Sequence, residues 1–323
     1  MAASQLYDKT IYTVHSKPLQ IQLQRDFPEA AVLFGKSNYP CNRDQSLNCS
    51  ECPLVRPSTC LHNCAYKQAK SFALKSNFRV LNYAYLLAEA NHVQFFSKQN
   101  LIVIDEADSL ENILYDFVSI HISEKTIKSL NTIFPNEQKE GEEVTDRLVS
   151  EWIDWGLWVQ RQIDYKIKDL TSYVSTLTVI STDDERMAVK RLEYYKNILS
   201  KLTIFLDNVD RSWQAEIKMN DYYRTKTVHF KPLWLNPQLT GPSLWSHSDR
   251  FLLMSATFPP IHILSRMLGI DQEQIDYLTL PSTFPVANRR CIISPAANLT
   301  HWTQKEETPK IVEAVRSILA KHP

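Results

Sequence analysis

The feature that most constrains the fold is the segment 101–108, in which the apolar residues Leu-Ile-Val-Ile run directly into Asp-Glu-Ala-Asp. An unbroken apolar run is typical of a strand that is buried on both faces of a parallel sheet. Open α/β sheets bind ligands at the carboxyl ends of their strands, and Asp105 and Glu106 stand at such an end. The segment therefore predicts an α/β fold with a ligand site after this strand. The alternative is a core strand that ends in a charged turn.

Asp105 and Glu106 also match a Walker B element, the acidic strand end of P-loop ATPases. In such a site Asp105 would hold Mg²⁺ against the nucleotide phosphates, and Glu106 would polarise the attacking water. A phosphate-binding loop of the form G-x-x-x-x-G-K-[ST] should accompany it. The chain has only five glycines, and Gly35-Lys36-Ser37 lacks the first glycine of that pattern because position 30 is alanine. We interpret Gly35-Lys36-Ser37 as a turn that ends a short strand.

Strand-like and helix-like segments alternate along much of the chain. Strands are predicted at residues 10–14, 31–34, 78–82, 101–104 and 251–254. Helices are predicted at 65–76, from 83 to 87, and after residue 17, where Leu19, Ile21, Leu23 and Phe27 are apolar. This alternation predicts a parallel α/β sheet. Sheet-like sequence resumes at 225, another strand is expected at 290–294, and a helix is expected at 309–321.

Five of the six cysteines are crowded into one short segment. They are Cys41, Cys49, Cys52, Cys60 and Cys64, with the spacing C-x7-C-x2-C-x7-C-x3-C. In a chain without a secretion signal, clustered cysteines favour metal binding over disulfides. Four thiolates could bind one zinc ion or one iron-sulfur cluster, and the spacing does not choose between them. The sixth cysteine, Cys291, is flanked by apolar residues and is expected in the core.

Composition and hydropathy narrow the class of protein further. Basic and acidic residues both number 36, so the overall charge gives no sign of a polyanionic partner, although local patches could still bind one. The first residues contain no apolar signal core, and no stretch approaches the ~18 apolar residues of a membrane helix. These features predict a cytoplasmic protein without a membrane segment.

The middle of the chain has the periodicity of two long helices. Apolar residues from Leu148 to Leu170 recur at intervals of three and four, which predicts one amphipathic helix. Thr182-Asp-Asp-Glu185 is a capping box that should open the second helix. Its apolar stripe is Ala188, Leu192, Tyr195, Leu199, Leu202, Leu206 and Val209. We predict an antiparallel helical hairpin with a coiled-coil-like interface. Three tryptophans are expected in the core or in the interface between the two helices, rather than in a base-stacking platform: Trp152, Trp155 and Trp158.

Several segments, taken in order along the chain, resemble one helicase family. The stretch 12–23, which contains His15-Ser16-Lys17, is similar to helicase motif Ia. Residues 35–41 and 64–70 are similar to the two ends of a cluster-binding loop. Asp105–Asp108 is similar to motif II, and Ser255-Ala256-Thr257 is similar to motif III. Residues 281–289 are similar to the segment that crosses into the second motor lobe. Together they resemble the iron-sulfur superfamily 2 helicases of the XPD and DinG type, most closely the DinG-like proteins of phages and bacteria.

The resemblance implies an α/β fold with three parts. A RecA-like parallel-sheet motor lobe would carry an inserted iron-sulfur cluster domain and a helical arch insertion, and a second motor lobe would be only begun. The implied boundaries are 1–36, 77–112 and 225–284 for the first lobe, 37–76 for the cluster domain, 113–224 for the arch and 285–323 for the start of the second lobe. The arch and the cluster domain would together form a gate for single-stranded DNA.

Members of this family couple ATP hydrolysis to movement along single-stranded DNA, typically 5′ to 3′, and unwind the duplex ahead. The resemblance therefore implies single-stranded and forked DNA as partners and a monomeric protein. It implies a [4Fe-4S] cluster on four of the five clustered cysteines and Mg²⁺ with ATP. Asp105 would bind Mg²⁺, and Glu106 would activate the attacking water.

The same resemblance implies roles for the other motif residues. Ala107 and Asp108 of motif II, with the Ser255–Thr257 segment of motif III, would link the nucleotide state to the DNA-bound lobe. His15, Ser16 and Lys17 would contact the DNA backbone. Such contacts are directed to phosphates and are therefore sensitive to salt.

The chain also departs from the family pattern. No Walker A loop precedes the strand at 10–14, nothing after residue 323 supplies a second lobe, and Asp108 stands where much of the family has histidine. We therefore expect an internal piece of a helicase, or the product of a split or truncated gene, with its Walker A and second-lobe segments missing or separately encoded. The alternative is a zinc-stabilised nucleic-acid-binding accessory module without motor activity. A nuclease of the related superfamily 2 branches is less favoured, because we find no arrangement of acidic residues and lysine in the sequence that indicates a nuclease active site.

Overall fold

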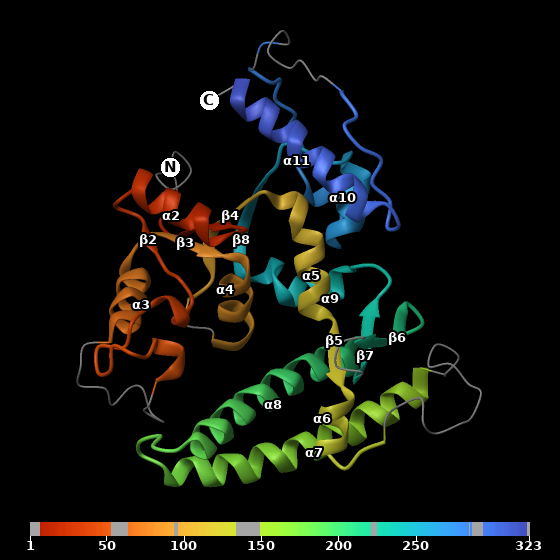
Figure 1. Cartoon of the computed structure of the whole chain (residues 1–323). Coiled ribbons are helices and arrows are strands. Elements are labelled where there is room, and N and C mark those ends of the chain that lie inside the picture. The colour runs from red at the N-terminus through yellow and green to blue at the C-terminus, as the bar shows by residue number, and fades with distance from the viewer. Residues whose placement is uncertain are drawn as a thin grey trace. The chain divides into compact units, whose positions relative to one another are not determined.

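The computed structural model describes residues 7–52, 64–93, 96–133, 149–220, 225–283, 285 and 293–321. The chain forms two compact units that divide between Asp276 and Tyr277. The first unit holds a parallel sheet, a small antiparallel sheet and two long helices, and the second holds helix α11, Gln304–Lys321 (Figure 1). Among the described residues, no helix is both long enough and apolar enough to cross a membrane.

A five-stranded parallel sheet forms the first layer of the fold. Its strands are β1 (Thr10–Val14), β2 (Ala31–Val32), β3 (Phe78–Asn82), β4 (Gln99–Asp105) and β8 (Ser248–Met254), in the order β2-β3-β1-β4-β8. Every neighbouring pair is parallel. The predicted parallel α/β sheet is confirmed, and it is consistent with a RecA-like helicase lobe. Gly35 precedes a short 3₁₀ helix, Lys36–Asn38, as expected for a turn.

Helices connect and cover these strands. They are α2 (Lys17–Asp26), α3 (Ala65–Lys75), α4 (Tyr83–Ala88), α5 (Leu110–Val118), α9 (Pro237–Ser243) and α10 (Ile261–Leu268). In α2 the buried side chain is Gln20, whereas Ile21 is half exposed. The Gln20 Nε2 donates to the Leu33 carbonyl at 3.1 Å, so a polar contact rather than an apolar stripe holds this helix against the chain after β2.

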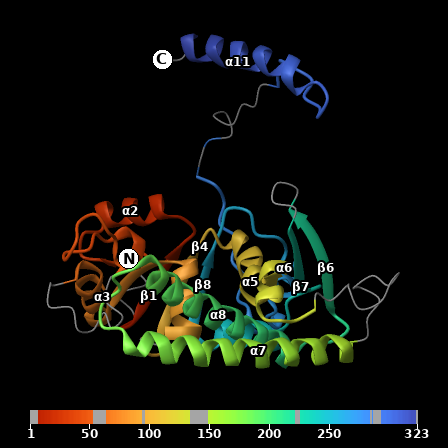
Figure 2. The same ribbon diagram turned by 60° about the horizontal axis from the view of Figure 1, so that its bottom comes forward.

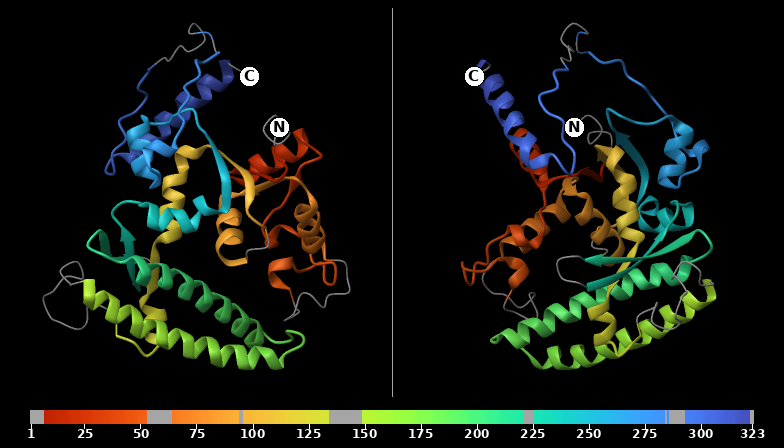
Figure 3. Two further views of the ribbon diagram at one scale, coloured as in Figure 1. Left: turned by 180° about the vertical axis from the view of Figure 1, so that it is seen from behind. Right: turned by 45° about the vertical axis from the view of Figure 1, so that its right-hand side comes forward.

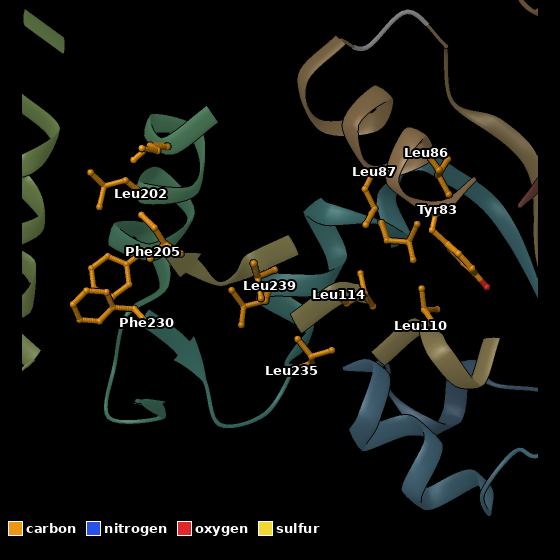
Figure 4. Close-up of a cluster of buried hydrophobic side chains, with 14 of the residues drawn as sticks. Tyr83, Leu86, Leu87, Leu110, Leu114, Leu202, Phe205, Phe230, Leu235 and Leu239 are labelled. Carbon is orange, nitrogen blue, oxygen red and sulfur yellow. The ribbon is translucent and has the colours of Figure 1, made fainter. Parts of the chain in front are cut away.

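One continuous hydrophobic core extends from the parallel sheet to the long helices. Ile102 and Ile104 of β4 are fully buried, as the apolar run predicted. The core continues through Leu110 and Leu114 of α5 to Phe205 and neighbouring side chains (Figure 4). Burying a side chain of this size contributes about 1.5–3 kcal/mol, so the acidic segment between β4 and α5 is anchored on both sides.

The small antiparallel sheet was not predicted. Its strands are β5 (Ile120–Ser123), β6 (Trp213–Asn220) and β7 (Thr225–Pro232), in the order β5-β7-β6. The sheet-like sequence that resumes at 225 was expected in the first motor lobe, but its strand pairs with β5 and β6 from the segment expected to form the arch. The burial along β7 alternates: Val228 and Phe230 are buried, and His229 and Lys231 are not. The Phe230 ring packs against Trp155 of α7 and Phe205 of α8, so one face of this strand is covered by the long helices.

The predicted helical hairpin is present as α7 (Val149–Thr176) and α8 (Asp183–Asn208). The two helices lie side by side in every view (Figures 1, 2 and 3). Thr182 and Glu185 form the predicted capping box, with the Glu185 N–H donating to the Thr182 hydroxyl at 3.2 Å and the Thr182 N–H donating to the Glu185 carboxylate at 2.9 Å. The capping box confirms where α8 begins.

The buried stripe of α8 differs from the predicted one in its second half. Ile198 and Phe205 are buried, whereas Leu199 and Leu206 are only partly buried. The ring of Phe205 packs against Trp213 and Phe230 of the small antiparallel sheet, so the buried face of α8 turns toward this sheet in its second half. The position predicted for Trp158 is also wrong, because its side chain is 49% exposed and its Nε1 donates to the Thr132 hydroxyl. Trp152 and Trp155 are buried, as predicted.

The hairpin is fixed to α5 by a lysine. The Lys201 Nζ of α8 donates to the carbonyls of Asp116 and Ser119 at 2.7 and 3.0 Å. These carbonyls belong to the last turn and the C-cap of α5, where helices leave acceptors unpaired and favour positive charge. On another side of α5, the Tyr115 hydroxyl donates to the Leu233 carbonyl at 3.0 Å. The helix that follows the acidic segment is therefore held by polar contacts near its C-terminus.

In the second unit, α11 begins at Gln304, before the predicted start at 309, and Pro309 lies within the helix. None of the described side chains of α11 is buried. The strand predicted at 290–294 falls mainly on residues outside the described part of the chain, as does Cys291. Ile293 and Ser294 are described and have no regular secondary structure.

Candidate functional site

Strand β4 lies between β1 and β8, and the three strands end at one edge of the sheet. Thr13 pairs with Ile104, and Asp105 pairs with Met254. The segments that begin at this edge are His15–Lys17, Asp105–Asp108 and Ser255–Thr257. The structure thus brings the three groups of candidate residues to the carboxyl edge of the parallel sheet, which is where open α/β sheets bind ligands.

Asp105 is the last residue of β4 and is partly buried. The Tyr12 hydroxyl donates to its Oδ2 at 2.8 Å, and the Glu106 backbone N–H donates to its Oδ1 at 3.0 Å. Burial of Tyr12 raises the pKa of its hydroxyl, and the hydrogen bond to Asp105 raises it further. Tyr12 is therefore protonated at neutral pH and acts as the donor. Each carboxylate oxygen keeps a further lone pair. The fixed carboxylate therefore retains the capacity to bind a cation.

Glu106 adopts the left-handed region, with φ 52° and ψ 44°. This conformation costs a non-glycine residue about 1–2 kcal/mol, and such strain is concentrated at functional sites. The peptides on both sides are held: the Tyr83 hydroxyl donates to the Asp105 carbonyl, and the Ser109 N–H and hydroxyl donate to the Glu106 carbonyl at 3.1 and 2.9 Å. The Glu106 side chain is exposed, so its carboxylate is accessible to water.

A hydrogen bond joins the acidic segment to the segment after β8. The Ser255 hydroxyl donates to Asp108 Oδ1 at 2.9 Å, and the Thr257 N–H donates to the Ser255 hydroxyl at 3.1 Å. Ala107 is buried, whereas Ala256 and Thr257 are exposed. Asp108 and Ser255 are therefore in direct contact although 147 positions separate them in the sequence.

His15, Ser16 and Lys17 connect β1 to α2 at the same edge. Ser16 occupies the N-cap position of α2, but its side chain makes no capping hydrogen bond. His15 and Lys17 are exposed. The rings of His15 and Tyr83 meet edge to face, with centroids 6.2 Å apart. Tyr83 thus contacts both the His15 segment and the carbonyl of Asp105.

Tyr12 and Tyr83 were not identified from the sequence as site residues. Tyr12 lies in the middle of β1, and Tyr83 directly follows β3, where the Asn82 side chain caps α4 by accepting from the Tyr85 N–H at 2.8 Å. A buried tyrosine hydroxyl usually has a hydrogen-bond partner. The presence of tyrosines in and directly after predicted strands was therefore the feature of the sequence that could have indicated them as site residues. Their partner could not be inferred without knowing that β4 lies next to β1.

Four of the five clustered cysteines are described, and Cys60 lies outside the described residues. All four thiols are free, and the sulfur atoms of Cys49 and Cys64 are 3.6 Å apart. Burial and the neighbouring thiols of Cys64 and Cys41 raise the pKa of Cys49 to about 11, against the effect of the Tyr66 N–H that donates to its sulfur. A metal that binds Cys49 must therefore displace a proton.

Helix α3 begins directly after Cys64 and connects the cysteine loop to strand β3 of the parallel sheet. The hydroxyls of Tyr66 on α3 and Tyr85 on α4 are 2.8 Å apart. The Lys70 Nζ lies 3.4 Å from the Glu89 carboxylate, and both side chains are largely buried. Breaking a buried ion pair is costly, because the remaining charge loses its partner. These contacts fix one end of the cysteine loop.

The thiols have the donor chemistry that zinc and iron-sulfur clusters require. A tetrahedral zinc with Zn–S bonds of about 2.3 Å gives a sulfur–sulfur separation of about 3.8 Å, which is close to the 3.6 Å between Cys49 and Cys64. Within the described ranges, no group of three or more His, Cys, Asp and Glu side chains is arranged to hold a metal ion. The described part of the loop therefore presents two converging thiols and not a complete metal centre.

The hydroxyl of Tyr83 can be tested by removing it alone. We expect Tyr83→Phe to lower the free energy of unfolding by about 1–3 kcal/mol in urea denaturation, because the Asp105 carbonyl loses a buried donor. Tyr165→Phe is the control, since Tyr165 is 66% exposed on α7, and it should leave stability unchanged. Equal stability of the two variants would contradict the proposed support of the strained peptide at Glu106.

In the comparison with protein families, residues 49–127 match the model of the family DEAD_2. This range contains β3, β4, Asp105–Asp108 and four of the clustered cysteines; it does not contain Cys41, His15–Lys17 or Ser255–Thr257. No curated protein matches the chain. DEAD_2 is a DEAD-like helicase domain found in XPD/DinG-type helicases, so residues 49–127 are similar to that domain and suggest a helicase-like nucleotide-binding function.

Proposed function

We propose that this chain acts in ATP-dependent DNA unwinding, as part of a helicase that moves along single-stranded DNA from 5′ to 3′ into forked duplex. The observation that carries the proposal is the hydrogen bond between Ser255 and Asp108. It joins two segments with the sequences of helicase motifs II and III, at the edge of a parallel sheet where ligands bind. The DEAD_2 match to the first of these segments supports the same conclusion.

The acidic segment would bind the nucleotide through Mg²⁺. Asp105 is the candidate ligand, because Tyr12 and the Glu106 N–H hold its carboxylate in one orientation. When bound, Mg²⁺ would neutralise charge on the phosphates. Glu106 would orient the attacking water, since its exposed side chain follows directly on Asp105. The 323 residues contain no G-x-x-x-x-G-K-[ST] loop, so we expect nucleotide binding and turnover by this chain alone to be weak.

The DNA would be contacted by the segment after β1. His15 and Lys17 are exposed, and Ser16 has a side chain that is not engaged in capping. The contact between His15 and Tyr83, together with the hydrogen bond from Tyr83 to the Asp105 carbonyl, offers a short path between this segment and the nucleotide site. A second link between the nucleotide state and the DNA would run through Ala107, Asp108 and the Ser255–Thr257 segment.

The cysteine loop would hold a [4Fe-4S] cluster on four of its five thiols, and the α7–α8 hairpin would form the arch of a gate for the single strand. A second candidate function is a zinc-stabilised nucleic-acid-binding accessory module without motor activity. The separation of 3.6 Å between the Cys49 and Cys64 sulfurs favours this candidate, because it is close to the edge of a zinc tetrahedron.

DNA contact can be measured by fluorescence anisotropy with labelled single-stranded oligonucleotides. We expect Lys17→Ala to weaken binding by a similar factor for unrelated sequences and to reduce the slope of log affinity against log salt by about 1, because one phosphate contact is lost. Lys125→Ala, at an exposed lysine of α6 (Glu124–Ser129), is the matched control and should change neither quantity. An identical loss in both variants, or no binding by the unmodified chain, would contradict the proposed DNA contact.

The metal can be identified by anaerobic purification followed by analysis of iron, sulfide and zinc. The helicase proposal predicts a brown protein with about four iron and four sulfide per chain, and the accessory-module alternative predicts a colourless protein with about one zinc. Cys49→Ser and Cys64→Ser should lose either metal, whereas Cys291→Ser, outside the clustered segment, should retain it. A protein free of both metals would exclude both metal centres.

A further inference from the structure

Two histidines lie side by side on the outer face of the small antiparallel sheet. His121 of β5 and His229 of β7 are directly paired in the register of these strands. Buried residues flank each of them, Ile120 and Ile122 on β5 and Val228 and Phe230 on β7. Because successive side chains of a strand point to opposite faces, both imidazoles lie on the face opposite the hydrophobic core.

The two imidazole rings are at chelating distance. Their centroids are 4.3 Å apart and their planes make an angle of 49°. For two imidazoles on one ion, metal–nitrogen bonds of about 2.0–2.1 Å place the ring centroids about 4.5–5.2 Å apart. Small side-chain rotations would therefore bring one nitrogen of each ring onto a common ion. The strand pairing fixes the backbone at both positions, so little conformational entropy would be lost on binding.

Charged side chains near the two histidines have partners of their own. Glu216 of β6 pairs with His229 on its other side, and its carboxylate lies 3.4 Å from Lys218 Nζ and 3.8 Å from Lys231 Nζ. Lys201 is bound to two backbone carbonyls of α5 and its C-cap. The lysines near the imidazoles therefore have acceptors, and two of them share the carboxylate of Glu216.

We propose that His121 and His229 form a binding site for a divalent transition-metal ion, with water completing the coordination. Imidazole ligands suit Zn²⁺, Ni²⁺ and Cu²⁺, whereas Mg²⁺ and Ca²⁺ prefer oxygen ligands. The site is made from elements other than the cysteine loop and the acidic segment, and it does not depend on the function proposed above. A bound ion would cross-link β5, which follows α5, to β7, and would stabilise the folded chain by mass action.

The test is isothermal titration of the full chain with NiCl₂, with His121→Gln, His229→Gln and the double variant. Each single variant should lose one binding event or weaken it by at least about tenfold, since even loss of a supporting partner of a metal ligand costs roughly 10–100-fold. The double variant should lose the same single binding event and no further one, because both histidines serve one chelate. His262→Gln, at an exposed position of α10, is the control and should bind as the unmodified chain does.

Thiols of the cysteine loop are also able to bind Ni²⁺, so the comparison rests on the difference between the histidine variants and the His262→Gln control. As a measurement that needs no variant, one equivalent of Cu²⁺ bound to the chain after alkylation of its free thiols, which would otherwise reduce Cu²⁺, should show hyperfine coupling to two imidazole nitrogens in its electron paramagnetic resonance spectrum. Identical titrations for all four variants and the unmodified chain, or a Cu²⁺ spectrum without imidazole coupling, would overturn the proposal.

Discussion

Strand β4 lies between β1 and β8, and its residues Ile102 and Ile104 are fully buried. This burial holds the carboxyl ends of three parallel strands at one edge, so that Asp105, Tyr12 and the Ser255 segment meet there. The left-handed conformation of Glu106 persists because hydrogen bonds hold the peptides on both sides of it. The geometry of the candidate site thus follows from the packing of the sheet and from these hydrogen bonds.

Helix α5 connects this edge to the hairpin. It begins at Leu110, directly after the acidic segment, and its last carbonyls accept hydrogen bonds from Lys201 of α8. A single core of buried side chains runs along the same path, from Leu110 and Leu114 to Phe205 (Figure 4). A packed core shifts between discrete arrangements more readily than it deforms continuously. A contiguous path of packed side chains and hydrogen bonds therefore connects the acidic segment to the α7–α8 hairpin.

Local signals were sufficient to predict β1 and β3 with their observed bounds, the capping box of α8 and the turn at Gly35. They were insufficient where the outcome depended on packing between distant segments. The buried stripe of α8 includes Phe205 because its ring packs against Trp213 and Phe230 of the small sheet, and β7 pairs outside the parallel sheet. The acids Asp105 and Glu106 were recognisable from sequence, but their support by Tyr12 and Tyr83 required the strand order.

The central claim is that Asp105 and the bond between Asp108 and Ser255 couple nucleotide to DNA. The most direct measurement is the Mg²⁺-dependent affinity for a fluorescent ATP analogue, with and without saturating single-stranded DNA. We predict weak, Mg²⁺-dependent binding that DNA strengthens at least about fivefold, that Asp105→Asn abolishes, and that Ser255→Ala leaves in place without the DNA effect. Binding that Asp105→Asn does not change, or that DNA strengthens equally in Ser255→Ala, would contradict the account.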